Sequence, residues 1–178
     1  MKKLLPAFLA GILTTFSFAP AGLWWLAPLT FALLFSLLLE TTPKRAFLTG
    51  WLFGAGLLCT GLVWIENSMS VYAGMPRALA ITLAMLLALG LSLYYGLAAW
   101  LAVRFTRERQ KAARLIALGV LLVVMEWVRG WFLTGFPWLT IGYTQIDSWL
   151  AGYAPLGGVL LLSLLVTLTA SALAGLIR

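Results

Sequence analysis

The sequence alternates between long apolar stretches and short polar segments. Six of these stretches approach or exceed the length of about 20 residues that a membrane-spanning helix needs. They cover about residues 4–19, 24–39, 46–65, 78–103, 115–130 and 156–177. The fourth is longer than one crossing needs, so we expect it to tilt or to extend past the hydrocarbon. We therefore predict an all-α integral membrane protein, in which residues 1–178 form a single domain, a six-helix transmembrane bundle.

The first stretch has the outline of a secretory signal peptide. Lys2 and Lys3 precede an apolar run that ends in Ala19-Pro20-Ala21. However, Pro20 interrupts the small-residue site that a signal peptidase cleaves, and Trp24-Trp25 begins another apolar run at once. We expect an uncleaved first helix.

The composition supports a membrane protein and excludes several other classes. Hydrophobic residues make up 63% of the chain and charged residues 10%, whereas soluble domains have about 45–50% and about 25%. The chain has no histidine and one cysteine. This excludes a disulfide framework, a Cys/His zinc site, a histidine-ligated haem and a triad with a histidine base, so we expect no metal and no cofactor. Cys59 has no charged residue within six positions, so we interpret it as a packing residue.

The positive charges predict the orientation of the bundle. A net charge of +7 on a soluble chain would suggest a nucleic-acid partner. Here the charges lie between the apolar stretches, so we expect no nucleic acid and place both termini in the cytoplasm. Ten Lys and Arg fall on the cytoplasmic side and two on the other: Lys2, Lys3, Lys44, Arg45, Arg104, Arg107, Arg109, Lys111, Arg114 and Arg178, against Arg77 and Arg129. The run 104–114 could bind anionic lipid headgroups, although we favour a role in topology alone.

Two ionisable residues lie near the end of the fifth stretch. Glu126 and Arg129 are three positions apart and so share one face of a helix. Charges at membrane depth are costly and need a partner or a function. The two residues could pair with each other and help to end the helix. Alternatively, Arg129 could offer its guanidinium group to a lipid phosphate. Both interpretations stay open.

The most unusual segment follows directly, at residues 131–138. It reads Trp-Phe-Leu-Thr-Gly-Phe-Pro-Trp, in which Pro137 breaks a continuing helix and Gly135 allows conformations that other residues resist. A plain aromatic belt at the membrane surface does not need these two residues. We therefore predict an extracytoplasmic re-entrant or interfacial loop. Further polar groups on the same side could orient a headgroup or support the loop: Tyr143, Thr144, Gln145 and Asp147.

Together, the segments 126–138 and 142–147 resemble the apolipoprotein N-acyltransferase family. Three other blocks agree with this resemblance: Phe18-Ala19-Pro20 ahead of Trp24-Trp25, the loop from Trp64 to Pro76, and Leu91-Ser92-Leu93-Tyr94-Tyr95-Gly96. One departure is Ala73, which stands where the family usually has a glycine. The resemblance covers essentially the whole chain.

The resemblance implies a two-step acyl transfer in the bacterial inner membrane. A cysteine thiolate takes an acyl chain from a phospholipid, usually phosphatidylethanolamine, and forms a thioester. The α-amino group of the S-diacylglyceryl-cysteine at the N-terminus of an apolipoprotein then accepts that chain. The membrane helices would hold both lipid substrates. The substrate-binding residues carried over by the resemblance are Glu126, Arg129, Trp131, Phe136, Pro137, Trp138, Tyr143, Gln145 and Asp147.

The resemblance reaches only the front part of the family's architecture. Members continue with a seventh helix, a periplasmic nitrilase-like domain that carries a Glu-Lys-Cys triad, and a last helix. Nothing here matches that domain, so no catalytic residue can be carried over and we expect the chain alone to be inactive. It looks like a truncated or fragmentary member, or one part of a split gene with a separately encoded nitrilase-like partner.

Two other classes of function remain as alternatives. A small transporter or channel would favour inverted repeats or broken helices in corresponding halves of the sequence. A pure membrane scaffold would have no lipid site, and Arg129 would then tolerate substitution.

Overall fold

The computed structural model describes residues 3–177, and every regular element among them is helical. The α-helices are α1 (Leu4–Thr15), α2 (Leu26–Leu38), α3 (Pro43–Gly61), α4 (Trp64–Asn67), α5 (Arg77–Leu91), α6 (Leu93–Phe105), α7 (Lys111–Arg129) and α8 (Ala154–Ile177). A π-helical turn, η1 (Ser68–Tyr72), follows α4, and three 3-10 segments precede α8: η2 (Phe132–Thr134), η3 (Ile141–Gln145) and η4 (Trp149–Tyr153). The prediction of an all-α chain is confirmed.

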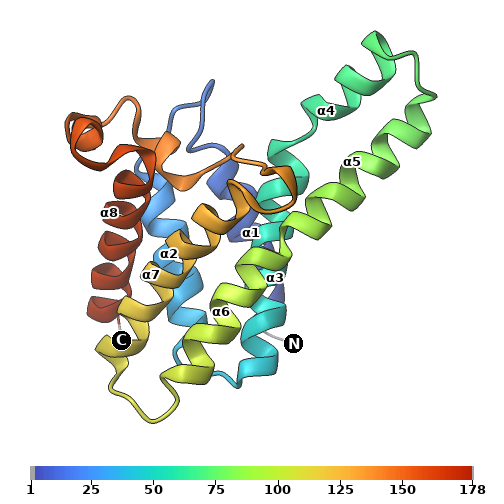
Figure 1. Cartoon of the computed structure of the whole chain (residues 1–178). Coiled ribbons are helices and arrows are strands. Elements are labelled where there is room, and N and C mark those ends of the chain that lie inside the picture. The colour runs from blue at the N-terminus through green and yellow to red at the C-terminus, as the bar shows by residue number, and fades with distance from the viewer. Residues whose placement is uncertain (1–2, 178) are drawn as a thin grey trace.

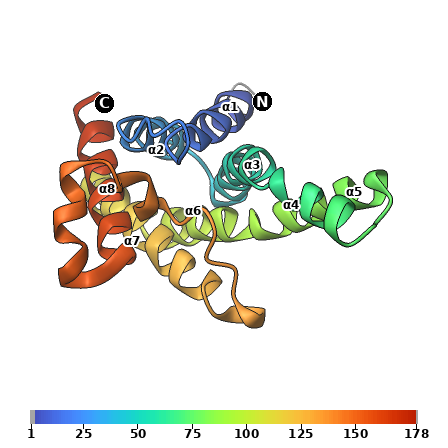
Figure 2. The same ribbon diagram turned by 90° about the horizontal axis from the view of Figure 1, so that it is seen from above.

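Six helices pack into a closed ring, which is visible in the end-on view of Figure 2. Helix α1 contacts α2 and α3, α3 contacts α6, α6 contacts α7, α7 contacts α8, and α8 returns to α2. Buried apolar side chains from all six helices form one continuous core. At its centre, the rings of Phe31 and Phe53 lie 4.9 Å apart between centroids. The ring therefore has a packed interior.

Not every ring helix has the length of a membrane span. By length and composition, two helical segments among the described residues could cross a membrane: Arg77–Phe105 and Trp149–Ile177. A third is added if the pair Pro43–Gly61 and Trp64–Tyr72, bent by 44°, counts as one span. Helices α1 and α2 are apolar but shorter. The six-span arrangement is therefore not confirmed and stays a prediction.

Several helices differ from the bounds that hydropathy predicts, and α7, for example, begins at Lys111 rather than near residue 115. Helix α1 ends at Thr15, before the apolar run ends at residue 19. The chain then turns over residues 16–22, where Gly22 has a positive φ of 63°. The third helix ends at Gly61 and bends into α4. The fourth is interrupted at Ser92, whose hydroxyl donates to the Ala88 carbonyl oxygen at 2.6 Å. Ser92 N donates to the same oxygen at 2.9 Å, so the break is confined to one residue and Arg77–Phe105 continues as one 29-residue helical segment.

Helices α4, η1 and α5 form an arm that projects from the ring in Figure 1. An ion pair across the arm joins Arg77 Nε to Glu66 Oε1 at 3.1 Å, and Ser70 Oγ donates to the same oxygen at 2.9 Å. The apolar side chains of Val71 and Tyr72 at its tip are largely exposed. The polar segment after residue 65 is helical as far as Tyr72, because α4 and η1 follow each other directly.

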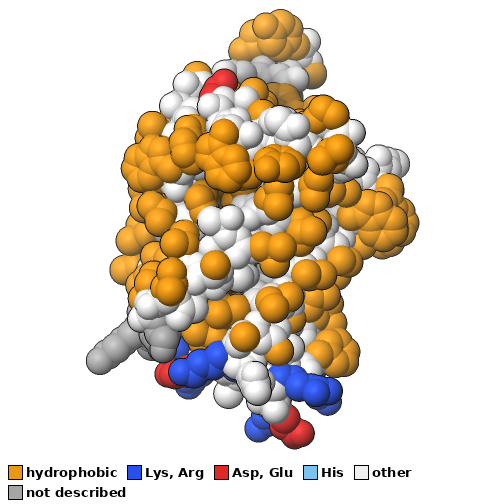
Figure 3. Space-filling view, turned by 90° about the vertical axis from the view of Figure 1, so that its left-hand side faces the viewer, with side chains coloured by type: hydrophobic (Ala, Val, Ile, Leu, Met, Phe, Trp, Pro, Cys, Tyr) orange, Lys and Arg blue, Asp and Glu red, His pale blue; other side chains and the backbone are white. Residues whose placement is uncertain are grey.

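The two ends of the ring differ in charge. Residues 3 and 177 lie at the same end as the α2–α3 and α6–α7 loops in Figure 1. Lys and Arg gather at this end on the face shown in Figure 3. Lys3 Nζ donates to the carbonyl oxygens of Leu37 and Glu40 at 3.1 Å each, and Arg114 Nη1 donates to that of Leu39. These cations satisfy the C-terminal carbonyls of α2 and match the negative end of its dipole. The irregular segment 130–153 covers the opposite end.

Glycines bring α3 very close to its neighbours. A Cβ atom on Gly56 would lie 2.2 Å from the carbonyl oxygen of Phe8, and one on Gly11 would lie 2.0 Å from that of Phe53. On the other side of α3, a Cβ on Gly50 would lie 2.6 Å from the carbonyl oxygen of Tyr95. Small residues let membrane helices approach in this way, because little hydrophobic force acts between helices in lipid.

This packing predicts opposite effects for two chemically identical substitutions. Gly56→Ala should destabilise the purified protein by about 1–3 kcal/mol, because the added methyl group must push α1 from α3. Gly90→Ala should leave the free energy of unfolding unchanged or raise it by about 0.5–1 kcal/mol, because nothing lies within 4 Å of that Cβ position. Unfolding in mixed micelles of increasing dodecyl sulfate content, followed by circular dichroism, measures both. Equal stability of the two variants would contradict the close α1–α3 contact.

Candidate functional site

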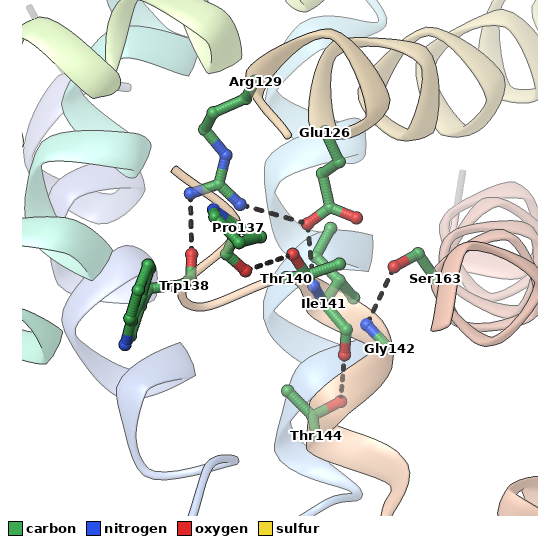
Figure 4. A network of polar contacts seen from close by, with 9 residues as sticks. All are labelled: Glu126, Arg129, Pro137, Trp138, Thr140, Ile141, Gly142, Thr144 and Ser163. Carbon is green, nitrogen blue, oxygen red and sulfur yellow. Dashed lines mark hydrogen bonds and ion pairs between the residues drawn. The ribbon is translucent and has the colours of Figure 1, made fainter. Parts of the chain in front are cut away.

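The last turn of α7 holds two buried charges, as Figure 4 shows. The side chains of Glu126 and Arg129 lie on one face of the helix, as their spacing predicts, and the residues are 5% and 1% exposed. Arg129 Nη2 lies 3.9 Å from Glu126 Oε1. That distance allows an ion pair but exceeds a hydrogen bond, so the pair alone does not satisfy either group.

The backbone of the following loop supplies one hydrogen bond to each side chain, whereas Glu126 Oε2 and Arg129 Nη2 stay without a hydrogen-bond partner among the described residues. Ile141 N donates to Glu126 Oε1 at 2.7 Å, and Arg129 Nη1 donates to the Trp138 carbonyl oxygen at 2.8 Å. Phe136 N also donates to the carbonyl oxygen of Arg129 at 2.8 Å. The two charges therefore hold residues 136–141 against the end of α7. Pairing with each other is only part of what they do.

This loop contains all the strained non-glycine backbone in residues 3–177. Leu133, Thr134 and Leu139 have positive φ angles of 50°, 73° and 56°. Gly135 has φ 81°, and a Cβ there would lie 2.1 Å from the carbonyl oxygen of Gly130. Positive φ at a residue with a side chain costs about 1–3 kcal/mol and persists only where the surroundings impose it. The loop is irregular, as its Gly and Pro residues predict, and such strain often accompanies a functional site.

Further hydrogen bonds tie the loop to itself and to α8. Thr140 Oγ1 donates to the Pro137 carbonyl oxygen at 2.7 Å, and Thr144 Oγ1 donates to that of Ile141 at 2.7 Å. Gly142 N donates to Ser163 Oγ of α8 at 2.8 Å. The loop is thus fixed between α7 and α8 (Figure 4).

Gln145 and Asp147 occupy different surroundings. Gln145 is buried: its Nε2 donates to the Trp24 carbonyl oxygen at 3.3 Å and to Thr144 Oγ1 at 2.8 Å, and its Oε1 accepts from Ser148 Oγ at 2.9 Å. Asp147 is exposed near the turn at Gly22. Gln145 therefore supports the loop from within, and Asp147 does not join the Glu126–Arg129 pair.

The aromatic residues of the loop form two clusters. Trp138 packs against Phe136 at 5.0 Å between ring centroids and against Trp64 of α4 at 6.2 Å. Its ring points away from Arg129 in Figure 4, although its carbonyl oxygen binds that residue. Trp131 packs against Trp127 at 5.4 Å. Trp131, Trp138 and Tyr143 each remain about half exposed, while Phe136 is partly buried and Pro137 exposed.

A half-open cavity of about 650 Å³ lies between the loop and the α5–α6 helix pair. Its wall is apolar apart from Tyr94, Thr134 and Arg129, and Arg129 is the one charged residue that lines it among the described residues. Leucines of α5 and α6 that line it, such as Leu86 and Leu93, also face outward. Arg129 Nη2 is buried and has no hydrogen-bond acceptor among the described residues. An apolar cavity with one cation can accept an amphiphile that carries a negative group.

A second cavity of about 310 Å³ lies on the other side of the loop. Glu126 lines it, together with residues of α7, of the loop and of α8: Trp127, Gly130, Trp131, Pro137, Thr140, Tyr143, Val159 and Leu160. The loop therefore separates an arginine-lined cavity from a glutamate-lined one.

Two buried residues near the pair escaped the sequence analysis. Ser163 holds the loop through Gly142. Tyr95 is 2% exposed, and its hydroxyl has no hydrogen-bond partner among the described residues. Ser163 is the one serine in the apolar run 159–166, and this position could have indicated a polar contact there. Tyr95 belongs to the block of residues 91–96, which indicates the family resemblance but no role for this side chain. No group of three His, Cys, Asp or Glu residues in the described part of the chain could hold a metal ion.

Comparisons with known proteins identify the family of this chain. Residues 10–172 match the model of the apolipoprotein N-acyltransferase N-terminal domain. The chain is 48% identical to the apolipoprotein N-acyltransferase of Chromobacterium violaceum and 44% identical to that of Vibrio parahaemolyticus, in each case over 98% of this chain and 34% of the relative. It is 45% identical to that of Azotobacter vinelandii over 97% of this chain and 34% of the relative. The chain thus spans about a third of the length of these relatives. It belongs to the apolipoprotein N-acyltransferase family, within which it matches the N-terminal domain.

Proposed function

We propose that this chain is the membrane domain of a phospholipid-dependent apolipoprotein N-acyltransferase. It positions lipid substrates for acylation of the N-terminal S-diacylglyceryl-cysteine during lipoprotein maturation. The observation that carries the proposal is the half-open apolar cavity with Arg129 in its wall. The names of the relatives supply the acyl transfer and the apolipoprotein acceptor.

The cavity suits the acyl donor for two reasons. Its leucine wall faces the side of the bundle where lipid tails would lie, and each buried CH₂ group contributes about 0.8 kcal/mol. The headgroup phosphate would be drawn to the charge of Arg129, whose Nη1 is committed to the Trp138 carbonyl oxygen. Arg129 is 1% exposed and its Nη2 is buried, so direct contact with Nη2 would require the loop to shift. A guanidinium group suits this task because it binds the protein and a phosphate with different N–H groups.

The remaining candidate residues divide into two roles. Glu126 and Gln145 are buried and bonded within the protein, so we assign them the positioning of the loop. The exposed or partly exposed side chains supply the surface that lipid substrates would touch: Trp131, Phe136, Pro137, Trp138, Tyr143 and Asp147.

The chemical step belongs to a part of the enzyme that this chain does not contain. The family resemblance implies a Glu-Lys-Cys triad in a nitrilase-like domain. Here the one thiol is Cys59 in α3, and the nearest acid along the chain, Glu66, is committed to Arg77 and Ser70. The triad would come from a linked or separately encoded nitrilase-like domain above the loop.

We also propose that all six ring helices cross the bacterial inner membrane, with both ends of this chain in the cytoplasm. The closed ring and the collection of basic residues at one end support this topology. Helix α7, at 19 residues, is about 28 Å long, close to the thickness of the hydrocarbon. A transporter or channel gains no support from a ring whose interior is packed.

The topology predicts opposite accessibility for two exposed positions. In a Cys59→Ser background, Ser68→Cys on the arm should react with an impermeant maleimide added to intact spheroplasts. Gln110→Cys in the α6–α7 loop should react only after the membrane is opened. Labelling of both cysteines from the same face would contradict the topology.

Arg129→Lys should lower acyl transfer by about ten- to a hundredfold in a full-length enzyme built from this chain and the remainder of a relative. Lysine keeps the charge but cannot bond the Trp138 carbonyl oxygen and a phosphate with the same geometry, and a hydrogen bond to a charged group is worth about 1.5–3 kcal/mol. The rate of N-acylation of a lipopeptide measures the effect. Arg77→Lys is the matched control and should change the rate less than twofold, because Arg77 is 77% exposed on the arm. Full activity of Arg129→Lys at a normal protein level would leave a scaffold without a lipid site.

The chain expressed alone should transfer no acyl group, because it lacks a thiolate with a base and a cation nearby. The purified chain is incubated with a fluorescent phospholipid and a diacylglyceryl-cysteine peptide. The readouts are a hydroxylamine-sensitive adduct on the protein and N-acylated peptide. If either product forms, and is lost in Cys59→Ser, the active site lies in this chain and the proposed division of labour is wrong.

A further inference from the structure

We propose that the α6–α7 loop binds the headgroup of an anionic phospholipid in the leaflet at the basic end of the ring. A polar cavity of about 440 Å³ opens there, lined by Arg104, Phe105, Arg107, Glu108 and Arg109. Three guanidinium groups and one carboxylate give this cavity a net positive charge. The site lies at the end of the ring opposite the Arg129 cavity and does not depend on acyl transfer.

The three arginines of this cavity have no charged partner within the described residues. The two ion pairs in that part of the chain join Arg77 to Glu66 and Arg129 to Glu126. No side-chain hydrogen bond of Arg104, Arg107 or Arg109 is formed within residues 3–177 either. Guanidinium groups are well suited to bidentate binding of phosphate. The cavity is therefore lined by donors that a phosphate could use.

A fourth arginine holds the loop in shape. Arg114 Nε donates to Thr106 Oγ1 at 3.2 Å, and its Nη2 donates to the carbonyl oxygens of Thr106 and Arg107 at 3.1 and 3.3 Å. Thr106 Oγ1 in turn donates to the Ala102 carbonyl oxygen at 2.6 Å. The loop is thus organised before any ligand binds, which removes much of the entropic cost of binding.

The apolar side chain in the cavity wall indicates a lipid rather than a soluble anion. Phe105 ends α6 and is 71% exposed, directly beside Arg104. An exposed ring at the end of an apolar helix favours the interface between hydrocarbon and headgroups. The neighbouring helix α7 begins at Lys111 without an acidic residue in its first turn or a side-chain cap, so its positive end adds to the field. In the proposed topology, the end of α6 lies at the depth of the phosphate groups of that leaflet.

A role in topology alone would require the charges but not the cavity. Native mass spectrometry of the purified chain with phosphatidylglycerol or phosphatidylcholine separates these interpretations. Arg107→Gln/Arg109→Gln should weaken phosphatidylglycerol binding by about 25-fold, at about fivefold per cation, and leave phosphatidylcholine binding unchanged. The matched control, Lys44→Gln/Arg45→Gln, removes the same charge from exposed positions in another loop at the same end and should change binding less than threefold.

Three results would overturn the proposal. They are unchanged phosphatidylglycerol binding in Arg107→Gln/Arg109→Gln, an equal loss in the Lys44/Arg45 control, and full displacement of the lipid by millimolar inorganic phosphate, which would assign the cavity to a soluble anion. Arg104→Lys/Arg107→Lys/Arg109→Lys keeps every charge and should weaken binding by only about three- to tenfold. It therefore tests the guanidinium geometry even if the glutamine variants express poorly.

Discussion

The irregular end of this membrane domain depends on two opposite charges that are buried where α7 stops. A charge out of water requires both a partner and hydrogen bonds, and Glu126 and Arg129 are too far apart to satisfy each other directly. The backbone of residues 136–141 supplies one hydrogen bond to each side chain, and three residues of this loop have positive φ angles. The charge pair thus gives a glycine- and proline-containing loop one fixed position between two cavities.

The helices of the ring below the loop are held together by a different kind of contact. In lipid, helices gain little from hydrophobic burial against one another, so contact depends on close backbone approach and on hydroxyl bonds. Helix α3 meets α1 through Gly11 and Gly56. Hydroxyl pairs add to this, with Thr14 and Thr30 at 2.8 Å between α1 and α2.

The sequence predicted those features that depend on local spacing, and missed those that depend on contacts between distant segments. Glu126 and Arg129 share a face because helical geometry places residues three apart together, and the Gly135–Pro137 segment is irregular because no helix tolerates it. Their partners at Trp138 and Ile141 are backbone groups, which carry no signature in the sequence. The burial of Gln145 depends on the Trp24 carbonyl oxygen, 121 positions away. Hydropathy likewise placed the fourth helix but not its one-residue interruption at Ser92.

That interruption has a mechanical consequence. The segment Arg77–Phe105 is 29 residues long, or about 43 Å, so it exceeds the hydrocarbon thickness of about 30 Å. Its outer part carries the arm, and its joint at Ser92 lies beside Gly90, Leu91 and Leu93, which line the Arg129 cavity. A displacement of the arm tip would be transmitted along α5 to residues of the cavity wall. A protein or lipid that binds Val71 or Tyr72 would therefore act on the shape of this cavity from a distance.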